Sequence, residues 1–423
     1  MISDHKYINF TTGGNRLPSA PQLWYDRAMK MALAHDWLNQ MGGAENVLEQ
    51  LVDMFPGAPV FTTIYAPDLM PAAYRRWDIR PTWLNRAPAI HRHHQPYLPL
   101  YPLAVAGMDF SGYDVILSNK SGFIHGLRHT PKQLHICYCL APTRYVWDYQ
   151  GYAAREGLGR RIGLALEPVI KRLQRWDFEA AQPPPPPFSP PLKGEEERGG
   201  GVHHFIAIST DIQARIKKFY LRESVIIYPP VDTARFRPVE QPADDYYFIV
   251  SRLIPYKRID LAVQAMSRLG RRLIIVGDGR DRAALEAMAG PTVEFKGRLP
   301  WADVVELMAH CRAFLFPGFE DFGIAPVEAQ AAGRPVIAFA RGGALDTIID
   351  GETGLFFREQ AVEALMAAVE QFEKCSFDPA AARANAERFS IPRFRRELGD
   401  FIAQKWGEFS SRSSRSQTEF GNE

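Results

Sequence analysis

The sequence has few cysteines, almost no net charge and no long apolar run. Its 423 residues include four cysteines and no Cys-x-x-Cys pair, which excludes a disulfide framework and predicts buried thiols in a reducing compartment. A formal net charge of +2 argues neither for nor against nucleic acid, which we do not expect as a partner. No apolar run reaches the roughly 18 residues of a membrane span, and the N-terminus lacks a signal-peptide layout, so we expect a cytoplasmic protein.

The composition and the first apolar segments indicate a soluble globular protein. With 46% hydrophobic and 23% charged residues, the chain is long enough for two ordinary domains. Residues 1–28 show no periodicity, and we expect a disordered or mis-started tail before a natural start at Met29 or Met31. From there "MKMALAHDWL" is strand-like, "NQMGGAE" is a glycine turn, and "NVLEQLVDMF" has apolar residues at helical spacing.

Two series of strand-like runs alternate with helix-like stretches. The first series continues through "YDVILSN", "QLHICYCLAP" and "HHFIAIST", and the second consists of "YYFIVSR", "RRLIIVGDG", "VEFKGR", "RAFLFPG" and "RPVIAFARGG". Such alternation predicts parallel sheets that are covered by helices on both faces. We therefore predict an α/β chain of two doubly wound, Rossmann-like domains facing each other across a cleft, with ligands at the carboxyl ends of the strands.

The predicted boundaries follow from where these patterns start and stop. We place the first domain at residues 29–228 and the second at 229–390, followed by a helix at 391–408 that packs back on the first domain and a disordered tail at 409–423. The segment 182–201 is rich in proline and glycine, whose backbones are extended or flexible. It is predicted to be a tolerated surface insertion, and a docking site for a proline-recognition module is the alternative.

Two glutamates lie eight residues apart in "FEDFGIAPVE". The preceding "RAFLFPG" is typical of a buried strand, and "VEAQAAG", closed by Gly333, is typical of a helix whose first position suits Pro326. Glu320 is then expected on a strand-to-helix loop and Glu328 in the first helical turn. A glutamate in a first turn also simply complements the helix dipole, so the pair is informative only together with its surroundings.

Cations and glycines at other strand ends indicate a phosphate-containing ligand. Arg252 and Lys257 in "SRLIPYKRIDLAV" follow a strand and precede a helix, where cations and a helix N-terminus can hold a diphosphate. A solvated basic loop is the alternative. Gly277 and Gly279 in "VGDG" would let backbone approach a ligand closely, and the pair Gly42–Gly43 occupies the first turn of the other domain.

With these motifs, the C-terminal half resembles the retaining GT-B glycosyltransferases of family 4, whose signature is Glu-x7-Glu. The segments "SRLIPYKRID", "FEDFGIAPVEAQAAGRPVIAF" and "GGALDTIIDGETGL" match the blocks of that family in the right order. "HDWLNQMGGAENVLE" and "HICYCLAPTRYVWDY" are similar to a mannosyltransferase-like branch of bacterial surface-polysaccharide and lipopolysaccharide synthesis. The resemblance covers residues 29–406 apart from the insertion.

The resemblance implies the GT-B fold, with an acceptor-side N-terminal domain and a C-terminal domain that binds the nucleotide sugar. Glu320 would contact the transferred sugar, and Glu328 would accept two hydrogen bonds from the ribose hydroxyls. Besides Glu328, the resemblance places a further set of residues at the nucleotide sugar: Gly42, Gly43, Gly277, Gly279, Gly297, Arg298, Phe322, Gly323, Ile324 and Ala325.

The resemblance also implies how the reaction proceeds. Arg252, Lys257 and the helix N-terminus would stabilise the charge that develops on the leaving diphosphate. Asp-x-Asp, which holds a metal in many sugar transferases, does not occur in the sequence. We therefore expect transfer without a metal or a cofactor and with retained anomeric configuration, and hydrolysis by two carboxylates is less favoured.

The sequence departs from the family at one point. Many relatives carry His-Thr-Pro where this chain has Leu140-Ala141-Pro142, so an active-site histidine is missing. His125 in "SGFIHGL" is a candidate substitute in the same cleft. A structural role for this histidine is the alternative.

The acceptor side is represented by one basic and aromatic stretch, "RRWDIRPTWLNRAPAIHRHHQPYLPLYPLAV". It contains Arg75, Arg76, Arg80, Arg86 and Arg92 and ends in an apolar run. One interpretation is a surface that rests on an anionic membrane, where lipid-linked sugar acceptors lie. The other is a basic loop followed by an ordinary helix. We expect a glycan or polyprenyl-linked acceptor, and the first interpretation adds peripheral contact with the inner face of the cell membrane.

The predicted function is hexosyl transfer from a nucleotide-diphosphate sugar, with GDP-mannose as the favoured donor. A UDP-sugar or another hexose donor is the near alternative. A GT-B-fold nucleotide-sugar 2-epimerase is the alternative from a different class, although the Glu-x7-Glu motif and the Arg/Lys pair favour transfer. The missing histidine leaves a binding protein without turnover as a third interpretation.

Overall fold

The computed structural model describes residues 29–149, 160–184, 199–240 and 244–419. The predicted tail at residues 1–28 lies outside the described part of the chain. The contacts divide the protein into two compact units. The first ends at Ile227 and takes in the residues from Arg395 onward, and the second spans Tyr228–Phe394 with Ser209–Asp211. The division falls next to the predicted boundary at residue 228.

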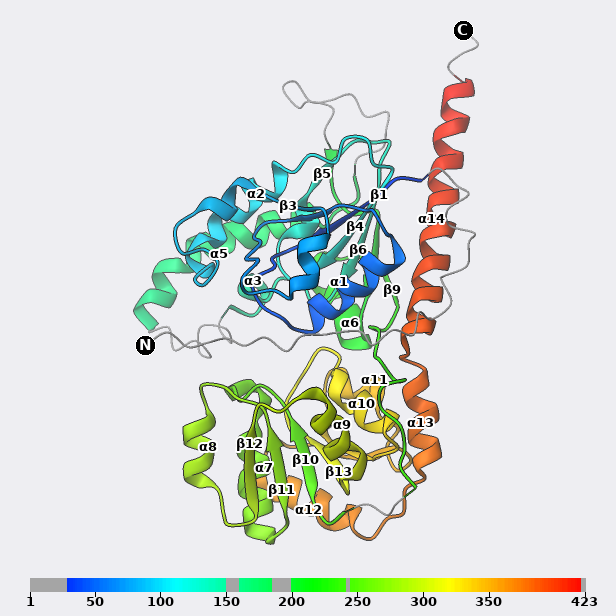
Figure 1. Cartoon of the computed structure of the whole chain (residues 1–423). Helices are drawn as coiled ribbons and strands as arrows, with labels where there is room; N and C mark the ends of the chain where they lie inside the picture. Colours follow the sequence, from blue (N-terminus) through cyan, green and yellow to red (C-terminus); the bar gives the residue numbers. More distant parts are fainter. Residues whose placement is uncertain (1–28, 150–159, 185–198, 241–243, 420–423) are drawn as a thin grey trace. The chain divides into compact units, whose positions relative to one another are not determined.

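The first unit is built on a parallel sheet of seven strands in the order β3-β2-β1-β4-β6-β8-β9 (Figure 1). All five residues of its strand β1 are buried, which explains why parallel strands read as continuous rather than alternating apolar runs. The strands are β1 (Met31–His35), β2 (Val60–Thr62), β3 (Ile79–Pro81), β4 (Val115–Lys120), β6 (Leu134–Cys139), β8 (His204–Ala207) and β9 (Ser224–Ile226).

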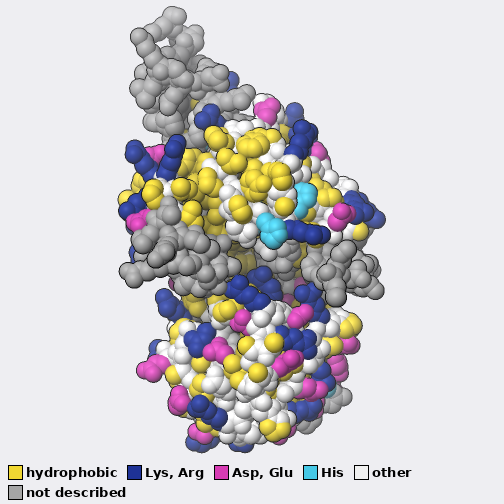
Figure 2. Space-filling model, turned by 90° about the vertical axis from the view of Figure 1, so that its left-hand side faces the viewer, with side chains coloured by type: hydrophobic (Ala, Val, Ile, Leu, Met, Phe, Trp, Pro, Cys, Tyr) yellow, Lys and Arg dark blue, Asp and Glu magenta, His cyan; other side chains and the backbone are white. Residues whose placement is uncertain are grey.

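Helices and short 3-10 turns complete the first unit. Helix α1 turns Val47, Leu48 and Leu51 inward, as their helical spacing predicts. Figure 2 shows that hydrophobic side chains also gather on the outside of this unit. The elements are α1 (Gly43–Met54), η2 (Ala72–Arg76), η3 (Trp83–Arg86), η4 (Gln95–Leu100), α2 (Tyr101–Ala106), η5 (Ile124–Gly126), α3 (Arg144–Trp147), α5 (Arg160–Ala180), α6 (Thr210–Tyr220) and, from Arg395 onward, α14 (Ile391–Glu419).

The second unit has a parallel sheet of six strands in the order β12-β11-β10-β13-β14-β15. Its strands are β10 (Tyr247–Val250), β11 (Leu273–Val276), β12 (Val293–Gly297), β13 (Ala313–Phe316), β14 (Val336–Phe339) and β15 (Gly354–Phe357). Its helices are η6 (Pro255–Lys257), α7 (Ile259–Leu269), α8 (Arg282–Met288), α9 (Trp301–His310), α10 (Ile324–Ala331), α11 (Ala344–Thr347), α12 (Val362–Phe372) and α13 (Pro379–Glu387).

The strand order reverses once in each sheet, between β1 and β4 in the first unit and between β10 and β13 in the second. The loops that follow the two strands at this reversal run to opposite faces of the sheet. A crevice therefore forms between them at the carboxyl ends of the strands. Both sheets are therefore doubly wound and Rossmann-like, as the sequence predicted. The arrangement of the two units across a cleft stays a prediction.

The last helix is longer than the sequence predicted. Helix α14 runs through Glu419, so the predicted disordered tail from residue 409 is corrected as far as that residue. The physical reason is that "SSRSSRSQTE" contains neither proline nor glycine to end a helix. Arg395 of this helix donates to Gln50 and Asp53, and the Phe401 ring lies 6.1 Å from His204.

The two ends of the proline-rich segment are part of the fold. Gly199–Gly200 form strand β7, which pairs antiparallel with β5 (Arg128–His129). The N–H of Val202 donates to the carbonyl of Gln182, which joins the flanks of the segment. Residues 185–198 lie outside the described part of the chain. The prediction of a dispensable insertion is therefore restricted to those residues.

Candidate functional site

Two of the predicted catalytic residues form an ion pair at the point where the strand order of the second unit reverses. Lys257 lies on the loop after β10, and Glu320 lies on the loop after β13. The Nζ of Lys257 donates to Oε1 of Glu320. Their side chains are 14% and 24% exposed, so this pair is partly withdrawn from water while it stays reachable from the surface.

A glycine fixes the position of Lys257. A Cβ on Gly318, at the exit of β13, would lie 2.8 Å from the carbonyl oxygen of Lys257 and 2.9 Å from its Cα. The carbonyl of the adjoining Pro317 accepts a hydrogen bond from Gln360. Because only glycine allows this approach, the two loops are held against each other and Lys257 is brought beside Glu320.

Arg252 lies on the same loop as Lys257 but is exposed. Its Nη2 is 3.3 Å from the hydroxyl of Tyr256, and within the described part of the chain no carboxylate pairs with it. An unpaired guanidinium presents a planar set of donors that suits phosphate oxygens. The structure thus brings Arg252, Lys257 and Glu320 to one edge of one sheet.

The loop after β14 holds Glu320 from the other side. The N–H of Gly343 donates to the carbonyl of Glu320, at 3.0 Å. A Cβ on Gly343 would lie 2.2 Å from backbone atoms of Phe322, so Phe322 is fixed by the same contact. Phe322 itself is buried, and its predicted contact with the nucleotide sugar stays a prediction.

Helix α10 begins two residues earlier than the sequence predicted. Gly323, with φ of +88°, precedes the helix, and Ile324 and Ala325 are its first two residues. Pro326 is therefore the third helical residue, where its missing N–H is still without cost, and Glu328 lies in the second turn. This corrects the expectation of Glu328 in the first turn, so the helix dipole no longer explains it. The helix thus begins four residues after Glu320, and the N–H groups of its first turn have no partner within the helix.

The carboxylate of Glu328 is half-buried and lacks a partner. Among the residues that the structure describes, no side chain or backbone group donates a hydrogen bond to it or forms an ion pair with it. Burial raises the pKa of Glu328 to about 7, with Arg235 lowering it and Asp232 raising it. A desolvated acceptor without a protein donor is what a ligand with hydroxyl groups would satisfy.

The glycines after β11 and β12 serve the packing of the strand exits. A Cβ on Gly277 would lie 1.8 Å from the carbonyl of Ser251, and one on Gly279 would lie 2.2 Å from that of Leu253. The N–H of Gly277 donates to the carbonyl of Gly297, at 2.7 Å. Close approach of the loop after β10 is therefore one reason for glycine at 277 and 279.

Arg298 follows β12 at the same edge of the sheet. Its side chain is 63% exposed, and its Nε lies 3.9 Å from Oδ2 of Asp278. Gly297 has a φ of +67°, which a side chain would strain. The predicted roles of Gly277, Gly279, Gly297 and Arg298 in binding a nucleotide stay predictions.

In the first unit, the predicted glycine turn follows β1. Gly42 precedes helix α1 in an extended conformation, and Gly43 is the first residue of that helix. The nearby Glu45 is buried, and its Oε1 lies 3.3 Å from Nε2 of His35 at the end of β1. The turn is thus held to the carboxyl end of the sheet, and its predicted contact with a nucleotide sugar stays a prediction.

His125 lies in the core of the first unit rather than at a surface. Its side chain has no exposed area, and its Nε2 lies 3.1 Å from the carbonyl of Asp177. Burial and the neighbouring Lys120 lower the pKa of His125 to about 4, so the ring is neutral. A side chain without exposed atoms cannot contact a sugar, and we correct the expected catalytic role of His125 to a structural one.

No sequence pattern pointed to the polar network in which His125 takes part. The carboxylate of Asp177 accepts hydrogen bonds from Thr143, Trp147 and Tyr220, at 2.5, 2.6 and 2.7 Å. Lys120, also fully buried, donates to Thr143 at 3.1 Å. In the sequence, Asp177 is one polar residue of an amphipathic helix, and only the fold buries it.

A second buried carboxylate, Asp36, has a signal that could have been used. It follows β1 directly and accepts N–H groups of Ser121, Gly122 and Ile124, at 2.6, 2.6 and 2.8 Å. These residues follow β4, so Asp36 joins the two strands between which the order of the first sheet reverses. An aspartate directly after a strand predicts such a position.

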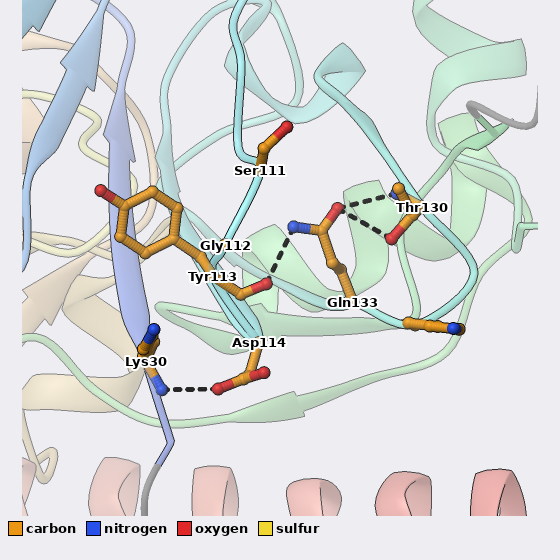
Figure 3. Close-up of a pocket in the computed structure, with 8 residues that line it drawn as sticks. Lys30, Ser111, Gly112, Tyr113, Asp114, Thr130 and Gln133 are labelled. Carbon is orange, nitrogen blue, oxygen red and sulfur yellow. Dashed lines mark hydrogen bonds between the residues drawn. The ribbon is translucent and has the colours of Figure 1, made fainter.

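The structure also has a surface hollow of about 550 Å³ away from the predicted site. It lies at the amino ends of β1, β4 and β6, and Figure 3 shows Gln133 bonded to Thr130 and Tyr113, and Lys30 to Asp114, along its wall. These bonds are internal to the wall and leave no buried polar group without a partner among the labelled side chains. The hollow is open, and we assign no ligand to it.

Two further features of the described residues bear on partners. Within the described ranges, no three or more His, Cys, Asp or Glu side chains are grouped so that they could hold a metal ion. Among the helices described, none combines the length and the apolar character that crossing a membrane requires.

Comparisons with known proteins place the second unit. Residues 231–389 match the family model described as glycosyl transferases group 1. Over 131 residues, the chain is 36% identical to a GDP-mannose-dependent monoacylated alpha-(1-6)-phosphatidylinositol monomannoside mannosyltransferase of Corynebacterium glutamicum, which covers 27% of this chain and 34% of that protein. It is 32% identical over 183 residues to the glycogen synthase of Mycobacterium tuberculosis, with 39% of this chain and 43% of that one covered. The chain thus matches less than half of the length of these relatives.

A comparison of structures extends over both units. The crystal structure of Anabaena HepE in complex with UDP matches with a TM-score of 0.61 at 17% identity and covers 89% of this chain and 100% of that one. At this identity the likeness concerns the fold, which is that of the GT-B glycosyltransferases. Residues 231–389 are thus similar to the glycosyl transferases group 1, and the two sheets match the GT-B fold.

Proposed function

We propose that the protein transfers a hexose from a nucleotide-diphosphate sugar to a glycan or polyprenyl-linked acceptor, with retained anomeric configuration and without a metal ion. The observation that carries this proposal is the edge of the second sheet where the strand order reverses. There the ion pair of Lys257 and Glu320 lies next to the exposed Arg252 and the first turn of α10. Glu328 on the same helix supplies an acceptor without a protein partner.

A cation and an anion held side by side suit a reaction in which charge separates. When the bond between sugar and diphosphate breaks, negative charge grows on the leaving oxygen and positive charge on the anomeric carbon. Lys257 and Arg252 stabilise the diphosphate, and the carboxylate of Glu320 stabilises the sugar. The N–H groups at the start of α10 add donors for the phosphate oxygens.

Glu328 binds the ribose in this proposal. Burial raises the pKa of Glu328 to about 7. When its side chain is ionised, the carboxylate accepts hydrogen bonds from two vicinal hydroxyls. Donor binding therefore favours the ionised carboxylate. Affinity for the donor weakens as the pH falls below about 7, because protonation removes one acceptor.

GDP-mannose is the donor that we favour, and a UDP-sugar is the alternative. A relative named as GDP-mannose-dependent supports the first, and the match to a structure in complex with UDP supports the second. The acceptor follows from the sequence resemblance to enzymes of bacterial surface polysaccharides. The reaction would then take place in the cytoplasm, at the inner face of the cell membrane.

The proposal is tested by thermal shift with GDP-mannose, UDP-glucose and ADP-glucose, followed by product analysis. A donor at 100 times its Kd should stabilise the protein by about 2.7 kcal/mol. Turnover should persist in EDTA, and the product should retain the anomeric configuration of the donor. Glu320→Gln should lower kcat with less effect on KM, whereas Glu370→Gln, an exposed glutamate of α12, should leave both unchanged.

Three outcomes would contradict the proposal. An epimerised nucleotide sugar formed without acceptor would make the protein a 2-epimerase. Donor binding without any product would make it a binding protein. Loss of turnover in EDTA, restored by magnesium or manganese, would overturn the metal-independent mechanism.

A further inference from the structure

The first unit carries an apolar surface that its own fold does not cover. Trp83 is 52% exposed and Leu103 is 65% exposed, both large apolar side chains on neighbouring elements, η3 and α2. Exposed Leu100 precedes α2, and helix α5 adds Leu166 and Val169. We call these five residues the Trp83 patch. In Figure 2, a broad area of hydrophobic side chains lies over the first unit, with Lys, Arg and His side chains at its border.

Elements η3 and α2 of the patch are apolar on two sides, whereas the outer side of α5 also carries the ion pairs Glu167–Lys171 and Arg175–Glu179. On the inner side, Leu84 of η3, Tyr101 of α2 and Ile170 of α5 belong to one buried cluster. On the outer side, the same elements present Trp83, Leu103 and Val169. An ordinary surface helix is polar on its outer side, so a second apolar side needs an apolar partner.

Beside η3 and α2 the charge has one sign, whereas α5 adds the exposed ion pair of Glu167 and Lys171 between and after its two patch residues. Residues 79–108 contain no Asp or Glu, and in this stretch Arg86 and Arg92 are exposed. Within the part of the chain that the structure describes, no acidic side chain pairs with either arginine. His93 beside them is also exposed. Unpaired cations at the edge of an apolar surface fit a partner that is apolar inside and anionic at its surface.

We propose that the Trp83 patch docks the protein on the surface of an anionic lipid bilayer. Trp83, Leu100 and Leu103 enter the boundary between headgroups and acyl chains, where an aromatic ring with a polar N–H is well accommodated. Arg86 and Arg92 contact anionic headgroups. This binding goes beyond the proposed transfer reaction and needs neither donor nor acceptor.

The charge pattern separates a bilayer from other apolar partners. A second copy of this chain would bring the same arginines against each other, and like charges at an interface cost affinity. A neutral apolar partner would leave the absence of acidic residues over residues 79–108 without a function. An anionic lipid bilayer would contact both the apolar side chains and the arginines beside them.

The test is cosedimentation of the full chain with vesicles. Vesicles of phosphatidylcholine mixed with phosphatidylglycerol should bind the protein, vesicles of phosphatidylcholine alone should bind much less, and added salt should weaken the binding. Replacing Arg86 and Arg92 by glutamine should lower partitioning about tenfold to thirtyfold, since each basic side chain near an anionic surface contributes about 1 kcal/mol. Leu103→Asp should abolish binding.

The controls exclude unfolding and unspecific effects. Leu221, 69% exposed and outside the patch, is the matched position, and Leu221→Asp should bind vesicles as the unchanged protein does. Melting curves and turnover with a soluble acceptor should stay unchanged in Leu103→Asp, because the side chain fills no core. Equal binding to both kinds of vesicle, no binding to anionic vesicles, or equal loss in both leucine variants would overturn the proposal. A dimer that Leu103→Asp dissociates, without vesicle binding, would instead make the patch an interface between copies.

Discussion

At the scale of single residues, the ion pair of Lys257 and Glu320 joins two positions for which the sequence predicted separate contacts. The pair is 14% and 24% exposed, so removing either partner leaves a partly desolvated charge. Arg252, by contrast, is exposed and lacks a carboxylate partner among the described residues. The two cations should therefore differ in what their loss does to stability, although both are placed at the diphosphate.

Replacing Arg252 by alanine should lower kcat/KM by about two to three orders of magnitude, as the loss of one preorganised donor does. The melting temperature should stay unchanged, because the side chain fills no core. Arg252→Lys should restore activity only in part, since an ammonium lacks the planar fork of a guanidinium. Arg268→Ala, on an exposed arginine of α7, is the matched control. Near-normal turnover in a folded Arg252→Ala protein would place the diphosphate elsewhere.

Replacing Lys257 by alanine should reduce activity to a similar extent and should also destabilise the second unit. The expected loss is about 1–3 kcal/mol, between the values for exposed and buried ion pairs. The double variant Lys257→Ala, Glu320→Gln should recover part of this stability, because no unpaired charge remains. Denaturant unfolding of the three proteins measures the effect. Equal stability of the single and double variants would mean that the pair contributes nothing to the fold.

Glu328→Gln should separate stability from donor binding. The pKa of Glu328 is raised from 4.5 to about 7 in the folded protein. Its contribution to the free energy of unfolding is therefore fully present below pH 4.5 and is lost as the pH rises through 7. The glutamine variant does not ionise and should be more stable than the unchanged protein at pH 8 by about 1–3 kcal/mol, with no difference near pH 4.5. Its donor affinity should be lower at pH 8. Unfolding curves and donor titrations at both pH values test this, and a pH-independent difference in stability would contradict it.

At the scale of elements, the segment between α5 and β8 has hydrogen-bonded flanks on both sides of residues 185–198. The carbonyl of Gly201 accepts hydrogen bonds from the rings of His129 and His135, and Gly199–Gly200 pair with β5. Joining Pro184 to Gly199 should therefore leave the melting temperature within a few degrees of the full chain. Deleting residues 182–201 should lower it clearly, because the β7 pairing and both histidine bonds disappear. The same melting temperature for both deletions would show that the hydrogen bonds of these flanks add no stability.

At the scale of the whole molecule, the two units should respond to acid in opposite directions. In the first unit, burial lowers the pKa of His203 to about 3 and that of His135 well below 6.5, with His129 and, for His203, Arg222 acting in the same direction. Stability from a lowered histidine pKa is present above pH 6.5 and is lost as the pH falls below it. In the second unit, the raised pKa of Glu328 makes the free energy of unfolding larger as the pH falls over the same range.

We therefore expect the melting curve to separate into two transitions as the pH falls from 7 to 5. The earlier transition should belong to the first unit, which loses about 1–2 kcal/mol for each such histidine. Calorimetry of the chain in the absence of vesicles measures both transitions. The variant His203→Asn should show a smaller shift of the first transition with pH. A single transition that moves upward in acid would contradict the assignment.

Local sequence patterns are enough to predict the two doubly wound sheets and the loops that carry the site. Continuous apolar runs, glycine turns and helical spacing are local patterns, and each strand predicted from them is present in the structure. The positions of Arg252, Lys257 and Glu320 after β10 and β13 also follow from such patterns, because parallel strands end at one edge of a sheet.

Which of these residues are paired and which are buried, in contrast, follows from the packing of distant segments. His125 and Asp177 lie 52 positions apart and meet in the core, and a Cβ on Gly277 would meet the carbonyl of Ser251. The physical reason is that hydrogen bonds and steric contacts between distant segments depend on where the strands place them. A local pattern specifies the element on which a residue lies, whereas its exposure and its pKa depend on neighbours that only the fold brings together.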